Sequence, residues 1–273
     1  MQLVGMYNGF GTTLGPHSAV TDKPTDGIPS RKEEITLRRV GIVAAWGPEL
    51  DAVNRNLPPV NPVTHGAWDF RWHHLDDNTE IISVVSGVGK VFCASATQLL
   101  IAKFAPCEMY MTGICGALQD ELLGESLVVP ERFYQHDVQS PATPGDPFDL
   151  NQGRSTWYEP DACLLQRFRA FTASSIRAHF GVVVSGDQRI RSGELRDALR
   201  QTFAAIAVDQ ELAAFAHVCT VNRVPFLGVK AVSDNANELT EQLQRRHKLK
   251  ACDAASNALI GFLSSVKQQT DKG

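Results

Sequence analysis

Seven short apolar runs, rich in valine and isoleucine, constrain the fold of this chain more than any other feature. Each run is bounded by glycine, proline or polar residues. Runs of this length and composition are typical of strands that are buried on both faces. In chain order they read RRVGIVAAW, EIISVVSG, CEMYMTG, SLVVP, FGVVVSG, AAIAV and VPFLGVKAV. They predict a sheet that is covered on both sides.

Stretches with helical character lie between these runs. We expect helices at Lys90 to Lys103, at Asp209 to Asn222 and from about Leu239 to Lys267. The last two carry their apolar residues at helical spacing on one stripe. Strands that alternate with helices of this length favour a mostly parallel sheet with helices on both faces. The sequence therefore predicts an α/β fold.

The N-terminal stretch and one internal segment differ in composition from the rest of the chain. Residues 1–36 are rich in glycine, proline, serine and threonine and show no amphipathic period, so we expect a flexible N-terminal extension. Residues 37–273 are expected to form one domain. Within it, residues 139–157 have the proline, glycine and aspartate density of a long loop, and such loops are often functional.

Charge, cysteines and the N-terminus exclude several classes of protein. A formal net charge of −4 is not the basic footprint of a nucleic-acid binder. No apolar run reaches the ~18 residues that span a bilayer, so no membrane segment is expected. The six cysteines contain no CxxC pair, which favours free thiols in a reducing compartment. Because the N-terminus also lacks the features of a secretory signal, we expect a cytoplasmic protein.

The common cofactor and metal motifs are missing. The segment GVGKVFC satisfies neither the P-loop nor the dinucleotide fingerprint. His73 and His74 are adjacent on a predicted strand, so they point to opposite faces and cannot chelate one metal together. We therefore expect neither a metal site nor a cofactor.

Polar residues follow several of the apolar runs directly. In open α/β sheets, ligands bind beyond the carboxyl ends of the strands. The residues in those places are therefore candidates for one polar small-molecule pocket. They include Glu49, Gly113, Arg189, Asp209, Glu211 and Asp234.

Six blocks of sequence occur in one order and at one spacing, and together they resemble the nucleoside phosphorylase/nucleosidase superfamily. The likeness is greatest to the methylthioadenosine/S-adenosylhomocysteine nucleosidases and covers roughly Arg39 to Leu263. The blocks read VGIVAAWGPELDAV, VVSGVGKVFCASATQLL, MTGICGALQDELLGESLVVP, VVVSGDQRI, AIAVDQELAAFAHVC and VPFLGVKAVSDNAN. The resemblance implies a three-layer αβα sandwich around a mostly parallel, mixed and partly curled sheet. It also implies a homodimer or larger assembly, in which a loop near Phe133 to Phe148 reaches the 5′ pocket of the neighbouring subunit.

Cleavage of a nucleoside requires protonation of the leaving purine and a nucleophile on the far face of the sugar, which calls for a pair of carboxyl groups. The resemblance implies that Asp234 is the general acid and that Glu49 activates water. It implies further that Glu211 grips both ribose hydroxyls, since a carboxylate accepts two hydrogen bonds. The structural alternatives are a helix cap for Asp234 and a first-turn contact with the helix dipole for Glu49. For Glu211 the alternative is a solvated residue in the first turn of the helix that follows.

The remaining candidate residues either match the family pattern or depart from it. Those that match are Gly113, Cys115 and Gly116 in a turn beside the nucleoside, Ile190, whose backbone reads the base, and Ser233, which precedes the acid. Those that depart from it are Ile114, Arg189, Asp209, Gln210 and Lys230. Arg189 replaces an aromatic residue that stacks on the purine, so it either stacks itself or meets an acidic substituent. These departures predict a pocket whose lining differs from that of the family.

Three functions remain open at this stage. A purine nucleosidase that uses water is favoured. A phosphorylase needs a cluster of arginine and serine around an oxyanion, and the strand ends supply only Lys90, Arg189 and Lys230. A nucleoside-sensing module needs neither the acid nor the base, so the presence of Glu49 and Asp234 argues against it.

Overall fold

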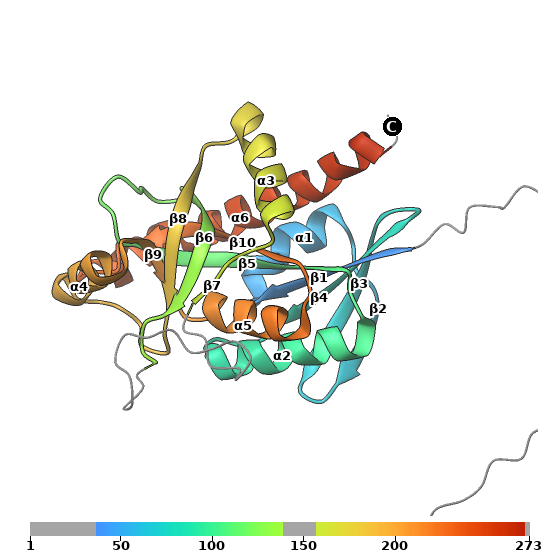
Figure 1. The fold of residues 1–273 in the computed structure, drawn as a ribbon, viewed down its shortest axis with the longest axis horizontal. Coiled ribbons are helices and arrows are strands. Elements are labelled where there is room, and N and C mark those ends of the chain that lie inside the picture. Colours follow the sequence, from blue (N-terminus) through green and yellow to red (C-terminus); the bar gives the residue numbers. More distant parts are fainter. Residues whose placement is uncertain (1–36, 139–156, 271–273) are drawn as a thin grey trace, which may run out of the picture. The chain divides into compact units, whose positions relative to one another are not determined.

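A ten-stranded mixed sheet organises the part of the chain that the computed structural model describes, which is residues 37–138 and 157–270 (Figure 1). The order along its main path is β10-β6-β8-β9-β5-β1-β4-β3-β2. Strand β10 pairs with β5 as well as with β6, so five strands close into a ring while β1, β4, β3 and β2 continue outward from β5. This arrangement confirms the predicted α/β fold with a mostly parallel, mixed sheet that partly curls.

All seven predicted strands are present, because buried, β-branched runs of this kind have few alternatives to a central strand. They are β1 (Arg38–Ala44), β4 (Thr79–Val85), β5 (Glu108–Ala117), β6 (Leu127–Gln135), β8 (Ala178–Ser185), β9 (Ala205–Asp209) and β10 (Phe226–Asp234).

Three strands lie outside the seven runs. They are β2 (Val60–His65), β3 (Trp68–Asp76) and β7 (Trp157–Tyr158). Strand β3 contains His73 and His74, which the sequence places on a strand with side chains on opposite faces. His73 is buried and its two ring nitrogens contact the Leu57 carbonyl at 2.7 Å and Ser83 Oγ at 2.8 Å, whereas His74 is exposed. The opposed directions are therefore confirmed.

Helices cover the sheet on both sides. Helix α2 (Lys90–Phe104) and helix α5 (Leu212–Asn222) pack together on one side, and both agree with the predicted helices (Figure 1). Helix α6 (Thr240–Thr270) crosses β10 and β5 on the other side, next to α1 (Asp51–Asn56) and α3 (Ala162–Ser175).

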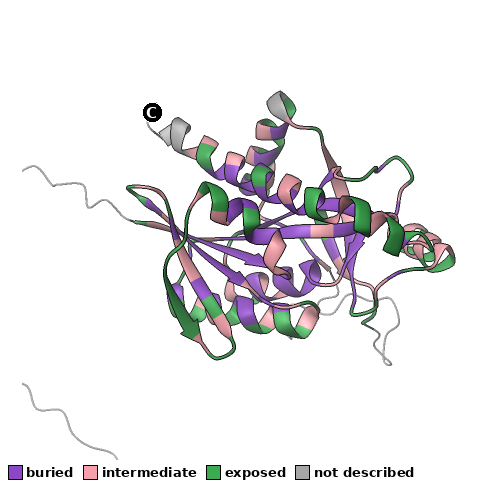
Figure 2. Cartoon of the chain, turned by 180° about the vertical axis from the view of Figure 1, so that it is seen from behind, coloured by how far each residue is buried: buried purple, intermediate pink, exposed green. Residues whose placement is uncertain are grey.

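Two further elements complete this part of the chain. They are the short 3-10 helix η1 (Gly47–Leu50) and helix α4 (Gly193–Phe203). None of the side chains of α4 is buried, which agrees with its green and pink ribbon in Figure 2, whereas the central strands are mainly purple. Helix α4 therefore lies at the border of the sheet, whereas α2 and α5 bury side chains against it.

The predicted extension over residues 1–36 and the loop over residues 139–156 lie outside the described residues. Among the described residues, no helix combines the length and the apolar character needed to cross a membrane. All six cysteines are free thiols, and four of them, Cys93, Cys115, Cys219 and Cys252, are buried.

The core under α6 depends on an aromatic cluster around Phe262. This side chain is 1% exposed. Its ring centroid lies 5.0 Å from that of Phe168, 5.9 Å from that of Phe171 and 6.2 Å from that of Tyr110. Aromatic pairs at these separations add to the stabilisation from buried area. Helix α6 is thereby fixed on the sheet, and α6 also forms part of the cavity described below.

We predict that Phe262→Ala lowers the free energy of unfolding by about 3–5 kcal/mol, because it leaves a cavity among these rings. Leu249→Ala on the same helix is the control, since that side chain is 61% exposed and its loss changes stability by less than ~0.5 kcal/mol. Urea unfolding followed by circular dichroism measures both. Equal effects of the two variants would contradict the packing role of Phe262.

Candidate active site

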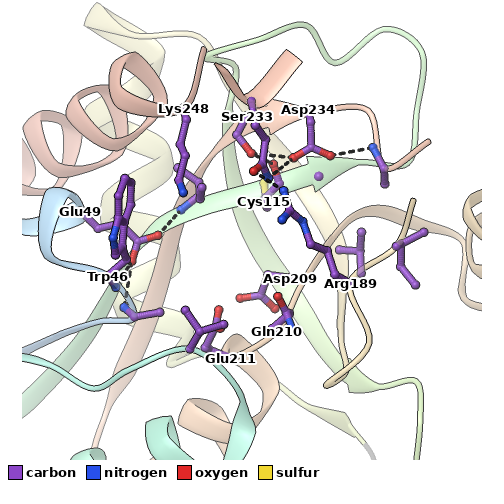
Figure 3. Close-up of a pocket in the computed structure, with 18 of the residues that line it drawn as sticks. Trp46, Glu49, Cys115, Arg189, Asp209, Gln210, Glu211, Ser233, Asp234 and Lys248 are labelled. Carbon is purple, nitrogen blue, oxygen red and sulfur yellow. Dashed lines mark hydrogen bonds between the residues drawn. The ribbon is translucent and has the colours of Figure 1, made fainter. Parts of the chain in front are cut away.

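One cavity of about 330 Å³ opens at the carboxyl ends of β1, β5, β9 and β10 (Figure 3). Eleven of the thirteen predicted site residues line it. These are Glu49, Ile114, Cys115, Gly116, Arg189, Ile190, Asp209, Gln210, Glu211, Ser233 and Asp234. The other two, Gly113 and Lys230, do not line the cavity and lie behind its wall. The strand-end rule therefore predicts the location of the cavity.

The carboxylate of Glu49 is held by the backbone. Its Oε2 accepts hydrogen bonds from the amides of Ala45 at 2.8 Å and Trp46 at 2.9 Å, and its Oε1 accepts one from Ile114 at 3.0 Å. Pro48 lies in the first turn of the 3-10 helix that carries Glu49, a position where proline costs no hydrogen bond. The backbone oxygen of Glu49 also accepts a hydrogen bond from Ser256 of α6. The side chain is 2% exposed and therefore has little freedom to move.

Gly113 makes room for this carboxylate. Its φ of +149° is one that side-chain-bearing residues rarely adopt. A Cβ at this position would lie 2.5 Å from Glu49 Oε1 and 2.7 Å from Glu49 Cδ. Sequence reasoning assigned the close approach at Gly113 to a ligand, but the group that approaches it here is Glu49.

Lys230 is a fully buried cation behind the cavity wall. Its Nζ lies 3.3 Å from Asp209 Oδ2 and 3.7 Å from Glu211 Oε2, yet it forms no hydrogen bond of good geometry within the described residues. Burial alone lowers the pKa of Lys230, but the carboxylates of Asp209, Glu49 and Glu211 together outweigh this and raise it. The ammonium group therefore stays charged and balances the carboxylates around it.

Asp209 accepts hydrogen bonds that hold together the elements beneath the cavity. Its Oδ1 accepts a hydrogen bond from Ser185 Oγ at 2.5 Å, and its Oδ2 accepts one from the Leu212 amide at 2.9 Å at the start of α5. A carboxylate at this place satisfies the free amides of a helix N-terminus. Asp209 therefore connects β8, β9, α5 and Lys230.

Glu211 is the carboxylate whose ionisation is most perturbed. Its Oε1 accepts a hydrogen bond from the Gly89 amide at 3.0 Å, just before α2. Burial raises the pKa of Glu211 to about 7; the charge of Lys230 opposes the rise and the charge of Asp209 adds to it. The sequence analysis did not predict this contact of Gly89.

Asp234 accepts four hydrogen bonds. Its Oδ2 accepts one from Ser233 Oγ and one from Gln244 Nε2, both at 2.8 Å. Its Oδ1 accepts one from the Ala236 amide at 2.9 Å and one from Thr240 Oγ1 at 3.1 Å. Asp234 therefore lines the cavity and also stabilises the turn into α6. Its two interpretations, as a residue of the site and as a cap of the following helix, are compatible.

Eight lining residues were not predicted from the sequence, and three of them have side chains that matter for the site. Trp46 follows β1, and Gln244 and Lys248 lie one turn apart on α6. Lys248 Nζ lies 3.7 Å from the centre of the Trp46 ring, a cation–π contact. The sequence could have indicated Gln244 and Lys248 only by their spacing, because polar residues four apart lie on one face of a helix. Such pairs usually face solvent, so this spacing does not predict a cavity wall.

Comparisons with known proteins agree with this geometry. Residues 39–267 match the family model of the phosphorylase superfamily. The chain is 31% identical to the 5′-methylthioadenosine/S-adenosylhomocysteine nucleosidase of Staphylococcus epidermidis, over 72% of this chain and 87% of that protein. It is 28% identical to the nucleosidase of the same name from Staphylococcus aureus, over 83% of this chain and 100% of that protein.

Solved structures of similar fold also include nucleosidases. The Helicobacter pylori 5′-methylthioadenosine/S-adenosylhomocysteine nucleosidase, in complex with a substituted pyrrolidin-3-ol, superposes with a TM-score of 0.79 at 25% identity, covering 84% of this chain and 99% of that chain. A structure of the futalosine hydrolase of Helicobacter pylori superposes with a TM-score of 0.79 at 26% identity, covering 84% and 98% of the two chains.

The raised pKa of Glu211 makes a prediction about stability. Between its ordinary pKa of 4.5 and about 7, the folded protein binds more protons than the unfolded chain, so this group lowers the free energy of unfolding as the pH rises. We expect Glu211→Gln to gain stability relative to the parent over that window and to show a constant difference above it.

Urea unfolding at intervals from pH 4.5 to 8 measures this difference. Glu159→Gln, which changes a carboxylate with 52% exposure outside the cavity, is the control for replacing a carboxylate by an amide. A difference for Glu211→Gln that stays constant or shrinks from pH 4.5 to 7 would show that the folded protein does not disfavour this charge.

Proposed function

The chain belongs to the phosphorylase superfamily, and on that premise we infer that it is a nucleosidase that hydrolyses the N-glycosidic bond of purine nucleosides. The relatives described above are nucleosidases for 5′-methylthioadenosine and S-adenosylhomocysteine. The observation that carries the proposal is one cavity into which Glu49, Glu211 and Asp234 all face. The products are the free base and the free sugar.

Asp234 is the proposed general acid. It lies at the end of the cavity opposite Glu49 and Trp46 (Figure 3). When the bond between the base and the sugar breaks, its electron pair goes to the purine, and Asp234 donates a proton to the imidazole-ring nitrogen. Ser233 and the turn into α6 hold the carboxyl group in place for this transfer.

Glu49 is the proposed base that activates water. A carboxylate offers about four positions for accepting hydrogen bonds. Three of them are taken by the amides of Ala45, Trp46 and Ile114. The remaining position, on Oε1, is available to a water molecule, whose proton Glu49 removes as the oxygen attacks the sugar.

The surroundings of Glu49 favour water over phosphate. Ile114 places an apolar side chain in the wall beside it. Lys230 is occupied by Asp209 and Glu211, and it lies outside the lining. Lys248, over the Trp46 ring, is the one lining cation near Glu49 among the described residues. A phosphate ion would therefore meet several carboxylates and a single cation, where an oxyanion site needs a cluster of them.

Glu211 is the proposed clamp for the two ribose hydroxyls, with Gln210 beside it. Its backbone contact at Gly89 and the charge of Lys230 fix one orientation of the carboxylate. In its ionised form the group accepts a hydrogen bond from each hydroxyl, which selects ribosides over deoxyribosides.

We further propose that the protein acts in the cytoplasm as a homodimer. Six free thiols support a reducing compartment. Exposed apolar side chains next to the cavity support an interface: Val88 is 54% exposed, Val91 75% and Phe92 56%. The expected contribution of the segment from Phe133 to Phe148 to a neighbouring site falls in part on residues 139–148, outside the described residues.

We predict that Glu49→Gln and Asp234→Asn each lower kcat/KM by about 10²- to 10⁴-fold, because each removes one proton-transfer group. Release of free base from methylthioadenosine, S-adenosylhomocysteine, adenosine, inosine and guanosine measures the effect. Asp253→Asn is the control, since that carboxylate pairs with Arg55 away from the cavity. Full activity of Asp234→Asn would remove the proposed acid from the mechanism.

We predict that Gly113→Ala lowers kcat by roughly 100-fold and leaves KM almost unchanged, because the added Cβ pushes the Glu49 carboxylate from its place. Gly47→Ala is the matched control, since a Cβ there meets nothing within 4 Å and Gly47 begins the 3-10 helix that carries Glu49. The same steady-state assay separates the two variants. Similar rates for both would indicate that the position of Glu49 does not limit the reaction.

A further inference from the structure

A chain of hydrogen bonds runs along one end of the cavity. The guanidinium group of Arg189 donates to Gln244 Oε1, and Gln244 Nε2 donates to Asp234 Oδ2 at 2.8 Å. Glu241 Oε1, 3.5 Å from Arg189 Nη1, balances the charge of the arginine. Arg189 and Asp234 lie at the same end of the cavity in Figure 3, away from Glu49. Under the proposed function this is the end that receives the base.

Arg189 determines which way the amide of Gln244 points. A guanidinium group only donates hydrogen bonds, so the amide must present its oxygen to Arg189. The amide nitrogen, which is a donor, then faces Asp234 and the base. Gln244 therefore offers the base a donor and cannot turn to offer an acceptor without losing its contact with Arg189.

Protein donors take all four of the hydrogen-bond-accepting positions of the Asp234 carboxylate. Two of its four donors, the Ala236 amide and Thr240 Oγ1, belong to the turn into α6, and a third, Ser233 Oγ, belongs to the preceding buried residue. Gln244 supplies the fourth donor from a half-buried side chain of the cavity wall. The amide of Gln244 is therefore the group that a purine ring nitrogen replaces at Asp234.

The displaced amide then meets the neighbouring atom on the same edge of the base. On that edge of a purine, the imidazole-ring nitrogen N7 is followed by the substituent at C6, which is an acceptor in 6-oxopurines and a donor in adenine. We propose that this cavity selects 6-oxopurine nucleosides, with Gln244 donating to O6 and Arg189 holding the orientation of the amide. The proposal rests on the proposed function and names the base of its substrate.

An adenine base would place its amino group against the amide nitrogen of Gln244. Two donors would then face each other, and at least one would remain unpaired. The expected discrimination between the two bases is roughly tenfold to hundredfold in kcat/KM.

The test uses two nucleosides that differ only at C6, 5′-methylthioinosine and 5′-methylthioadenosine. For the parent, kcat/KM should be at least about tenfold higher for the inosine compound. Gln244→Leu should bring the ratio close to one, and Gln244→Glu, which presents only acceptors, should shift it towards the adenosine compound. Arg189→Met should also lower the ratio, because the amide is then free to turn. Gln242→Leu, an exposed glutamine on the same helix, should leave the ratio unchanged.

Several results would overturn the proposal. A parent that prefers the adenosine compound would do so, as would an unchanged ratio in both Gln244 variants. Cleavage of neither nucleoside would instead contradict the proposed hydrolysis. In that case the affinities of the parent for free hypoxanthine and adenine, measured by calorimetry, decide the question of the base, and tighter binding of adenine would refute the inference.

Discussion

The buried ammonium group of Lys230 is the interaction on which the rest of the site depends. Four carboxylates, those of Glu49, Asp209, Glu211 and Asp234, are nearly buried around one cavity, and Lys230 is fully buried beside two of them. Without a cation, like charges in a medium of low polarity would repel each other strongly. Lys230 is on β10, Asp209 is the last residue of β9 and Glu211 follows two residues later. The interaction that balances the charges therefore also joins the ends of these two strands at the cavity.

Backbone amides also hold these carboxylates. The start of α5 binds Asp209, the residue before α2 binds Glu211, and the amides of Ala45, Trp46 and Ile114 bind Glu49. Amides of this kind belong to rigid elements, so the groups are in position before a ligand arrives. Ordinary helix starts and strand ends thus orient Glu49, Asp209 and Glu211, whereas Asp234 also depends on side chains of α6.

The sequence predicts the sheet and the cavity well because both depend on local patterns. Buried runs form central strands, and polar residues that follow them meet at one edge. Strand β2 was missed because its side chains are nearly all exposed and give no apolar pattern. Gln244 and Lys248 were missed because their place in the wall depends on how α6 crosses the sheet. Gly113 and Lys230 were assigned to the pocket itself, but close packing puts them behind its wall. The boundary of the N-terminal extension remains a prediction.

The central claim is that water attacks the sugar of a purine nucleoside. A turnover in water enriched in ¹⁸O, analysed by mass spectrometry with and without phosphate, tests it most directly. The account predicts one ¹⁸O atom in the released sugar, at the carbon that carried the base, and a rate that does not depend on phosphate. A sugar 1-phosphate without the label, formed only when phosphate is present, would contradict it.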